Sequence, residues 1–236
     1  MDKIVENKSL KDKIIYVVLT LLPMAIYMVF YMPTFFWVES LEPAGGFHQI
    51  HVALDDKIPV LEGFIIPYAM WLPYLVIGMI ALGIKGRVIA RKTSYMLMAG
   101  MTLFIIICLV YPNAVDLRCQ IPDRNNIFMG FIKYLHSIDT PTNVLPSLHV
   151  YDALVVAAGI HIGFKEKKAV VIASDILVFL ICISTVFVKQ HSVLDVLAAV
   201  VIFIPVLIII CFVIRPVNKK IDKQVERQSE QLADQL

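Results

Sequence analysis

Long apolar blocks separated by short charged segments dominate the chain. Six of these blocks carry few charged residues and lie at about residues 14–37, 64–84, 93–111, 148–164, 168–188 and 193–214. A transmembrane helix needs roughly 20 mostly apolar residues to cross a hydrocarbon core of about 30 Å. The pattern therefore predicts an all-α, polytopic membrane bundle of about six transmembrane helices, formed as a single domain by residues 1–236. The first block is too long for a signal peptide, and no small-residue cleavage pattern follows it, so we interpret it as a retained span.

Two of these blocks have features that set them apart. The block at 64–84 contains Pro67 and Pro73, which predict a kink that a membrane helix tolerates when its neighbours satisfy the freed backbone groups. The block at 148–164 is the least hydrophobic and contains Asp152 and His161. Polar groups within a span are costly unless they face the bundle interior or a wet cavity. We therefore expect these polar side chains to face the bundle interior or a wet cavity.

The composition agrees with a membrane protein and excludes other classes. Apolar residues make up 59% of the 236 residues and charged residues 17%, whereas soluble domains average roughly 45–50% and about 25%. A net charge of +2 is too small to indicate nucleic-acid binding, so we expect the membrane as a partner and no nucleic acid. The four cysteines form no C-x-x-C pair, which argues against a zinc site or a disulfide framework. The composition indicates no oligomeric state.

The distribution of basic residues predicts the orientation in the membrane. Lys and Arg concentrate before residue 14, at 85–92, at 165–168 and beyond residue 214, and these segments alternate with the loops 38–63, 112–147 and 189–192. Basic loops remain on the cytoplasmic side. The pattern predicts a multi-pass protein of the cytoplasmic (plasma) membrane with both termini in the cytoplasm and the 112–147 loop outside. Loosely helical spacing of apolar residues predicts that the tail, 218–236, is a cytoplasmic helical extension.

Two short segments carry candidate chemistry. In Pro146-Ser147-Leu148-His149, Ser147 is a natural N-cap, and the free N–H groups of the first helical turn form a ready anion site within reach of His149. The second segment runs from His191 to Asp195, and this i, i+4 spacing puts both side chains on one helical face. A carboxylate there can fix one ring nitrogen and leave the other free to attack. Both segments fall on the outer side of the predicted topology.

At these residues the chain resembles the type 2 phosphatidic acid phosphatase superfamily, in particular the branch that includes inositolphosphotransferases. The family pattern reads K-x6-R-P, then P-S-G-H, then S-R-x5-H-x3-D. The second part matches Pro146 to His149, and the third matches Ser184, His191 and Asp195 in order and spacing. The resemblance covers about residues 111–200 and extends to the six-span layout, so it implies the fold of that superfamily.

The match departs from the family pattern at several positions. Tyr111 stands at the Lys and Cys119 at the Pro of the first part, Leu148 at the Gly of the second, and Thr185 at the Arg of the third. Arg118 is the cationic phosphate ligand that remains. The basic residues that could replace the missing ones are Lys189, Arg124 and Lys133.

The resemblance implies a metal-independent and cofactor-independent lipid phosphatase. His191 would attack the phosphorus of a lipid phosphate substrate and form a phosphohistidine, Asp195 would hold and stabilise the imidazole, and His149 would protonate the leaving alcohol. The phosphoryl oxygens would be bound by Arg118, Ser147, the backbone around Leu148 and Lys189. Preplaced donors at the phosphoryl oxygens do most of the electrostatic work in such transfers.

Several alternatives remain open from the sequence. The same site could serve a lipid phosphotransferase that moves a phospho-headgroup between lipids, and a catalytically inactive membrane scaffold is the non-enzymatic alternative. Asp152 could support His149 or could be a solvated or tail-paired carboxylate near the membrane edge. His48 and His51, with Asp55 and Asp56 nearby, leave a metal site open, although the ligand set is incomplete.

Overall fold

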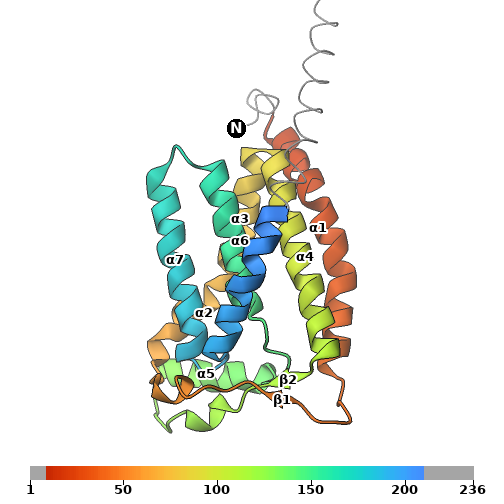
Figure 1. The fold of residues 1–236 in the computed structure, drawn as a ribbon. Helices are drawn as coiled ribbons and strands as arrows, with labels where there is room; N and C mark the ends of the chain where they lie inside the picture. Colours follow the sequence, from red (N-terminus) through yellow and green to blue (C-terminus); the bar gives the residue numbers. More distant parts are fainter. Residues whose placement is uncertain (1–8, 210–236) are drawn as a thin grey trace, which may run out of the picture.

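A computed structural model describes residues 9–209 as a helical bundle with a looped cap at one end. Figure 1 shows the long helices running roughly along one direction, while a shorter helix lies across the capped end. The long helices are α1 (Leu10–Glu39), α3 (Trp71–Lys85), α4 (Arg87–Val110), α6 (Leu148–Gly163), α7 (Lys168–Phe187) and a last helix that spans Val193–Ile209, drawn in blue. The predicted tail helix at 218–236 and the end of the sixth predicted span lie outside the described residues.

The capped end contains the short elements. These are the helices α2 (Ile65–Ala69) and α5 (Ile127–Ile138), the strands β1 (His48–Gln49) and β2 (Asn113–Ala114), and the 3₁₀ turns η1 (Asp55–Lys57), η2 (Glu62–Phe64) and η3 (Leu117–Gln120). The two strands pair in parallel, with His48 opposite Asn113. This pairing ties the loop after α1 to the loop after α4, so both loops close over the same end of the bundle.

Four helical segments are long and apolar enough to cross a membrane. They are Leu10–Glu39, Glu62–Lys85, Arg87–Val110 and Lys168–Phe187. Leu148–Gly163 and Val193–Ile209 are apolar but shorter, and the second ends where the described residues end. The protein is therefore an α-helical membrane protein, and the count of six spans stays a prediction. The 16 residues of α6 fit an inner helix, since Val150, Val155 and Val156 are completely buried.

The prolines and the basic residues between 67 and 92 lie at helix boundaries. The kink expected near Pro67 and Pro73 is confirmed, because α2 ends at Ala69 and α3 begins at Trp71. Proline has no backbone N–H, so Pro73 cannot donate to the carbonyl of Ala69. The prediction of a basic loop at 85–92 is wrong: the chain turns only at Gly86, and α4 begins at once with Arg87.

The early start of α4 has a physical cause in its contact with α1. The Arg87 guanidinium lies 4.9 Å from the centre of the Tyr16 ring, and the Arg87 backbone N–H donates to the Tyr16 hydroxyl at 3.1 Å. These contacts stabilise the first turn of α4 against α1. A further close contact joins α4 to α6, because a Cβ atom on Gly100 would overlap the Tyr151 ring.

Charge separates the two ends of the bundle. Lys85 and Arg87 lie at the end where α3 meets α4, and Lys165 and Lys168 lie at the same end in the turn between α6 and α7. The opposite end carries β1, β2, α5 and the start of α6. The predicted orientation assumes that the basic segments share one side of the membrane, and these four residues do lie at one end. That this end faces the cytoplasm stays a prediction.

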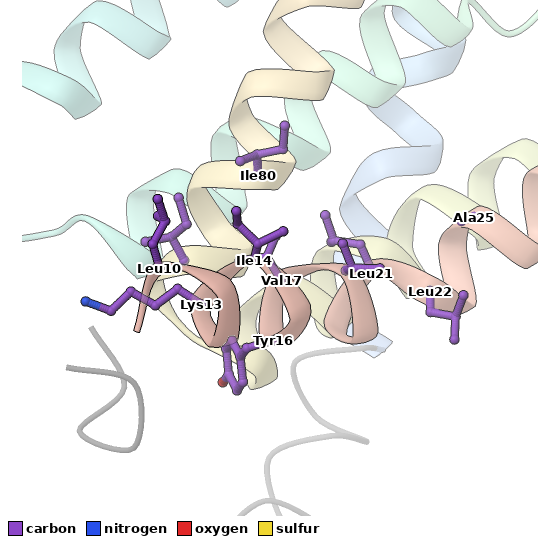
Figure 2. Close-up of a pocket in the computed structure, with 11 residues that line it drawn as sticks. Leu10, Lys13, Ile14, Tyr16, Val17, Leu21, Leu22, Ala25 and Ile80 are labelled. Carbon is purple, nitrogen blue, oxygen red and sulfur yellow. The ribbon is translucent and has the colours of Figure 1, made fainter. Parts of the chain in front are cut away.

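An apolar hollow of about 570 Å³ lies along the first half of α1, at the end of the bundle opposite the cap (Figure 2). Its walls come from α1 and α3 and include Leu10, Ile14, Leu21 and Ile80. This composition fits contact with acyl chains, and the candidate chemistry lies at the other end of the molecule.

Candidate active site

The first candidate segment forms the start of α6. Ser147 occupies the N-cap position as predicted, but its side chain makes no capping hydrogen bond. Instead, the Ser147 backbone N–H donates to the Asp195 carbonyl at 3.1 Å, which ties the start of α6 to the last helix. The Ser147 hydroxyl is buried and has no partner among the described residues. The first N–H groups of a helix have no intrahelical acceptor, so this helix start still presents donors.

The second candidate segment forms the turn between α7 and the last helix. The backbone N–H groups of Gln190 and His191 both donate to the Thr185 carbonyl at 3.1 Å, and Lys189 adopts a left-handed conformation with φ of 59°. The turn places His191 Nδ1 at 3.3 Å from Asp195 Oδ2. Asp195 Oδ2 also accepts from the Ser192 backbone N–H at 2.9 Å. The predicted pairing of His191 with Asp195 is confirmed.

The two candidate histidines lie against each other although 42 residues separate them. The His191 Nε2 atom is 3.4 Å from His149 Nδ1, and the ring centres are 5.5 Å apart. Trp71 and Tyr68 flank the His149 ring, with centre-to-centre distances of 4.3 and 4.6 Å. Asp195, His191 and His149 therefore form a continuous line of groups that can hold and pass a proton.

A small cavity of about 80 Å³ opens beside the two histidines. Its polar lining consists of His149, His191, Gln190, Asn143, Asp139, Glu39, Thr140 and Thr142. Phe35, Phe104 and Leu148 supply apolar wall. The cavity has room for a few water-sized groups. It is the place where a reacting group can reach both imidazoles.

Arg118 lies behind this cavity and does not line it. Its Nη1 atom donates to the carbonyls of His136 at 3.0 Å and Asp139 at 2.8 Å, and Nη2 donates to Gln190 Oε1 at 2.8 Å. Gln190 Nε2 in turn donates to Asp139 Oδ2 at 2.8 Å. Burial lowers the pKa of the Arg118 guanidinium and of the His136 imidazole, the latter to about 4. Arg118 thus positions Gln190, and its direct role in phosphate binding stays a prediction.

The other predicted cations also lie away from the cavity. Lys189 is buried, and its ammonium group donates to the Asp55 carbonyl at 2.7 Å. Burial lowers the pKa of Lys189, with Asp55 and Asp56 opposing the shift. Arg124 pairs with Glu62 and Lys133 pairs with Asp123, each at 2.8 Å. Each of these groups therefore has an acceptor already, and none of them lines the cavity.

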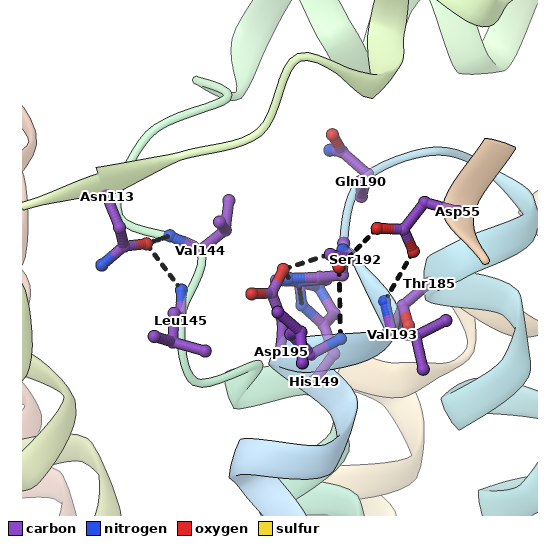
Figure 3. Close-up of polar contacts among 12 residues, drawn as sticks. Asp55, Asn113, Val144, Leu145, His149, Thr185, Gln190, Ser192, Val193 and Asp195 are labelled. Carbon is purple, nitrogen blue, oxygen red and sulfur yellow. Dashed lines mark hydrogen bonds and ion pairs between the residues drawn. The ribbon is translucent and has the colours of Figure 1, made fainter. Parts of the chain in front are cut away.

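Asp55 is a residue whose role sequence reasoning missed. Its carboxylate is buried and accepts from the Ser192 hydroxyl at 2.7 Å and the Val193 backbone N–H at 2.9 Å (Figure 3). It also accepts from the Val52 backbone N–H at 2.9 Å. It acts as an N-cap for the last helix from a segment 137 residues away. A lone acidic residue in a loop gives no sequence signal of such a contact.

The histidines beside Asp55 do not form a metal site. The His48 ring stacks on Tyr111, with ring centres 4.2 Å apart. His51 binds Asp116 at 2.9 Å through Nδ1 and Asp56 at 3.0 Å through Nε2. These two carboxylates raise the pKa of His51 to about 8. Within residues 9–209 no group of three or more His, Cys, Asp or Glu side chains could hold a metal ion.

The structure tests two of the alternatives for Asp152, and the tail with which it could pair lies outside the described residues. The side chain is buried inside the bundle at 2% exposure, so the solvated alternative is wrong. Its Oδ1 atom has no hydrogen-bond partner, and among the described residues no hydrogen bond joins it to His149. His161, the other polar group of α6, pairs with Asp175 of α7 at 2.7 Å.

Asn113 shapes the loop that leads into α6. Its Oδ1 atom accepts from the backbone N–H groups of Val144 and Leu145, both at 2.9 Å (Figure 3). This contact fixes the segment that presents Asn143 and Ser147 to the site. Asparagine next to a predicted span gave no signal of this role, because its partners lie about thirty residues further along.

Comparison of the chain with protein-family models, with curated proteins and with solved structures found no match.

Proposed function

We propose that the protein is a membrane-embedded, metal-independent lipid phosphatase that acts through a phosphohistidine on His191. The observation that carries this proposal is the position of His191 between Asp195 and His149 at the edge of a cavity. A carboxylate on Nδ1 keeps Nε2 available as a nucleophile, and a second imidazole within reach can serve as general acid. The resemblance to type 2 phosphatidic acid phosphatases supports the same assignment.

The proposed reaction has two steps. His191 Nε2 attacks phosphorus, the bond from phosphorus to the lipid oxygen breaks, and His149 gives its proton to the departing alcohol. Asp195 stabilises the positive charge that develops on the His191 ring. Water then attacks phosphorus, its proton passes to His149, and the bond between nitrogen and phosphorus breaks. The helix start at Leu148 and the unpartnered Ser147 hydroxyl supply donors for the phosphoryl oxygens.

A lipid phosphotransferase is the second candidate. It follows the same first step, but a lipid hydroxyl replaces water in the second step. The carboxylates of Glu39 and Asp139 in the cavity lining favour this candidate, because they disfavour the two negative charges of a phosphate monoester.

The activity test uses purified protein in mixed micelles with a panel of lipid phosphates, a chelator, and alcohol acceptors in half of the samples. We expect turnover that persists in the chelator and that His191→Ala abolishes. His161→Ala is the matched control, since His161 pairs with Asp175 away from the cavity. Turnover that disappears in chelator and returns only with added magnesium or manganese would contradict the proposal.

We also propose that the site faces away from the cytoplasm. Single cysteines at Asn126 and at Glu166, introduced in a Cys119→Ser background, test this orientation with an impermeant thiol reagent on intact cells. The background is needed because the native Cys119 is exposed at the capped end. We expect labelling at position 126 and none at 166. The reverse pattern would overturn the orientation.

A further inference from the structure

The charge of the cavity is the feature that the proposed function leaves unexplained. Glu39, the last residue of α1, and Asp139, which follows α5, line the cavity together with the two histidines. No Lys or Arg side chain is part of its described lining. A site built only for a phosphoryl group would present cations there. This one presents two carboxylates instead.

Asn143 adds an independent sign that a ligand belongs in the cavity. Its side chain lines the cavity and is only 6% exposed, and its Oδ1 atom has no hydrogen-bond partner in the part of the chain that the structure describes. The backbone of Asn143 is held in the left-handed region, with φ of 52°. A buried acceptor without a donor costs about 1–3 kcal/mol, so native proteins rarely leave one unfilled. The missing partner of Asn143 is a hydrogen-bond donor.

The carboxylates have capacity for the same donor. The Thr140 hydroxyl donates to Glu39, and Gln190 Nε2 donates to Asp139. The side chains of Asn143 and Thr142 also hydrogen-bond to Glu39, and the Thr140 backbone N–H donates to Asp139. An ionised carboxylate offers about four acceptor positions, so about one stays open on Glu39 and two on Asp139. The desolvated surroundings of the Asp139 carboxylate raise its pKa, with His191 and Arg118 opposing the shift. A cation placed between the two carboxylates would offset this cost of burial.

We propose that the substrate is a zwitterionic phospholipid whose headgroup carries a primary ammonium next to a phosphodiester. This inference rests on the phosphohistidine chemistry of the proposed function and, because the substrate is a phosphodiester, names the substrate class of its second candidate, the lipid phosphotransferase. The phosphodiester, with one negative charge, faces His149, His191 and the start of α6. The ammonium faces Glu39, Asp139 and Asn143, so that its three N–H groups meet three acceptors. A cavity of about 80 Å³ suits a compact headgroup of this kind.

The chemical step for this substrate is balanced by the residues already described. His191 Nε2 attacks the phosphodiester, the bond from phosphorus to the diacylglycerol oxygen breaks, and that oxygen takes the proton of His149. The aminoalkyl phosphoryl group stays on His191. An acceptor hydroxyl, from water or a second lipid, then attacks phosphorus and gives its proton to His149 as the bond to nitrogen breaks. Diacylglycerol is therefore the first product.

The wild-type test measures diacylglycerol release from mixed micelles of lipids with identical acyl chains. The panel holds phosphatidylethanolamine, phosphatidylcholine, phosphatidic acid and a phospholipid with an uncharged polyol headgroup. We expect kcat/KM to be highest for phosphatidylethanolamine. The quaternary ammonium of phosphatidylcholine lacks N–H donors, so it should react more slowly. Equal or faster turnover of phosphatidic acid or of the polyol lipid would overturn the inference while leaving the proposed function intact.

Variants of the two carboxylates test the assignment of residues. Glu39→Gln and Asp139→Asn should each reduce the preference for phosphatidylethanolamine over phosphatidic acid by about ten- to hundredfold, the range expected for a hydrogen bond to a charged group. The thermal unfolding midpoint of each variant in detergent shows whether it is folded. Asp123→Asn is the matched control, because Asp123 is an exposed carboxylate paired with Lys133 at the same end of the bundle. An unchanged preference in both variants would overturn the assignment.

Failure of the proposed function has a different signature. If neither a phosphorylated His191 nor turnover of any lipid is found in wild-type protein with intact folding, the proposed function fails and this inference fails with it. If a phosphohistidine forms from phosphatidic acid and no amine-bearing lipid reacts, only the inference fails.

Discussion

Two polar networks meet at residues 189–195, and they differ in how completely their atoms are paired. On one side, the Asp55 carboxylate accepts three hydrogen bonds of 2.7–2.9 Å, and its backbone carbonyl accepts a fourth from Lys189. On the other side, His191 lies 3.3 Å from Asp195 and 3.4 Å from His149. Asp195 Oδ1 and the Ser147 hydroxyl are buried and have no partner within residues 9–209.

The difference in pairing separates a structural network around Asp55 from a reactive network around His191. The buried Asp55 carboxylate accepts three hydrogen bonds from the protein itself, so the Asp55 network acts as an anchor that fixes the turn. Long contacts and unpaired atoms leave capacity, as expected in a site whose hydrogen bonds tighten only when a substrate is present. Variants of the anchor should therefore change stability, and variants of the reactive network should change turnover.

The largest expected effect on the reactive side, after loss of His191 itself, comes from Asp195→Asn. The substitution keeps the shape of the side chain and removes the charge that orients His191. We expect kcat to fall by about 10³–10⁴-fold, by analogy with the carboxylate of a serine protease triad. The thermal unfolding midpoint in detergent should change little. Turnover of the Asp195→Asn protein at near wild-type rate would remove Asp195 from the reactive network.

His149→Ala should have the next largest effect. Loss of a general acid typically costs about 10²–10⁴-fold in rate. The loss should shrink for a substrate with a nitrophenol leaving group, because that group departs without a proton. Rates for an alkyl and a nitrophenyl phosphate ester, compared between His149→Ala and the control His161→Ala, measure the difference. An equal loss for both leaving groups would assign His149 to binding instead.

Asp55→Ala should lower the free energy of unfolding, because Asp55 anchors the turn. The change leaves the Ser192 hydroxyl and the Val52 and Val193 N–H groups without their acceptor, and each unpaired buried donor costs about 1–3 kcal/mol. We expect the free energy of unfolding to fall by about 3–9 kcal/mol in Asp55→Ala, by less in Asp55→Asn, and to stay unchanged in Asp123→Asn. Turnover per folded molecule should fall less than in Asp195→Asn. A variant with wild-type stability and no activity would move Asp55 to the reactive side of the comparison.

The smallest expected effect concerns His51, which pairs with Asp116 and with Asp56, the residue after Asp55. The carboxylates of Asp116 and Asp56 raise the pKa of His51 from its usual 6.5 to about 8. A raised pKa in the folded state means that the protonated ring stabilises the fold below pH 6.5 and that this contribution is lost as pH rises through about 8. We expect the unfolding midpoint to fall over that interval in wild type and to vary less in His51→Gln. His48→Gln, in which a stacked ring is lost, should retain the wild-type pH dependence.

The parts of this site that follow from sequence are the local ones. His191 and Asp195 are four residues apart, and Ser147 stands next to the helix that it starts, so helical geometry alone predicts their placement. The meeting of His149 with His191 was expected from the shared side of the topology and the family resemblance. Their charge predicts that the basic residues of 85–92 lie in a solvated loop. The contact of Arg87 with Tyr16 instead lets a helix begin there.

The rest depends on contacts between distant segments. Asp55 reaches Ser192, Arg118 reaches Gln190, and Asn113 reaches Val144, and none of these pairs has a fixed spacing along the chain. The helix α5 also escaped prediction, because its twelve residues are too few for a span. Met129 and Ile132 on its inner face are completely buried, which shows that packing against the bundle stabilises it.

The central claim is that His191 carries the phosphoryl group, and peptide mapping of the trapped intermediate tests it most directly. Wild-type protein would react with a lipid labelled at phosphorus, be quenched in denaturant at alkaline pH, and be digested for mapping and for stability to acid and base. The account predicts an acid-labile, base-stable adduct on the peptide that contains His191, absent in His191→Ala and present in His161→Ala. Label on Ser147, or turnover of His191→Ala at near wild-type rate, would contradict it.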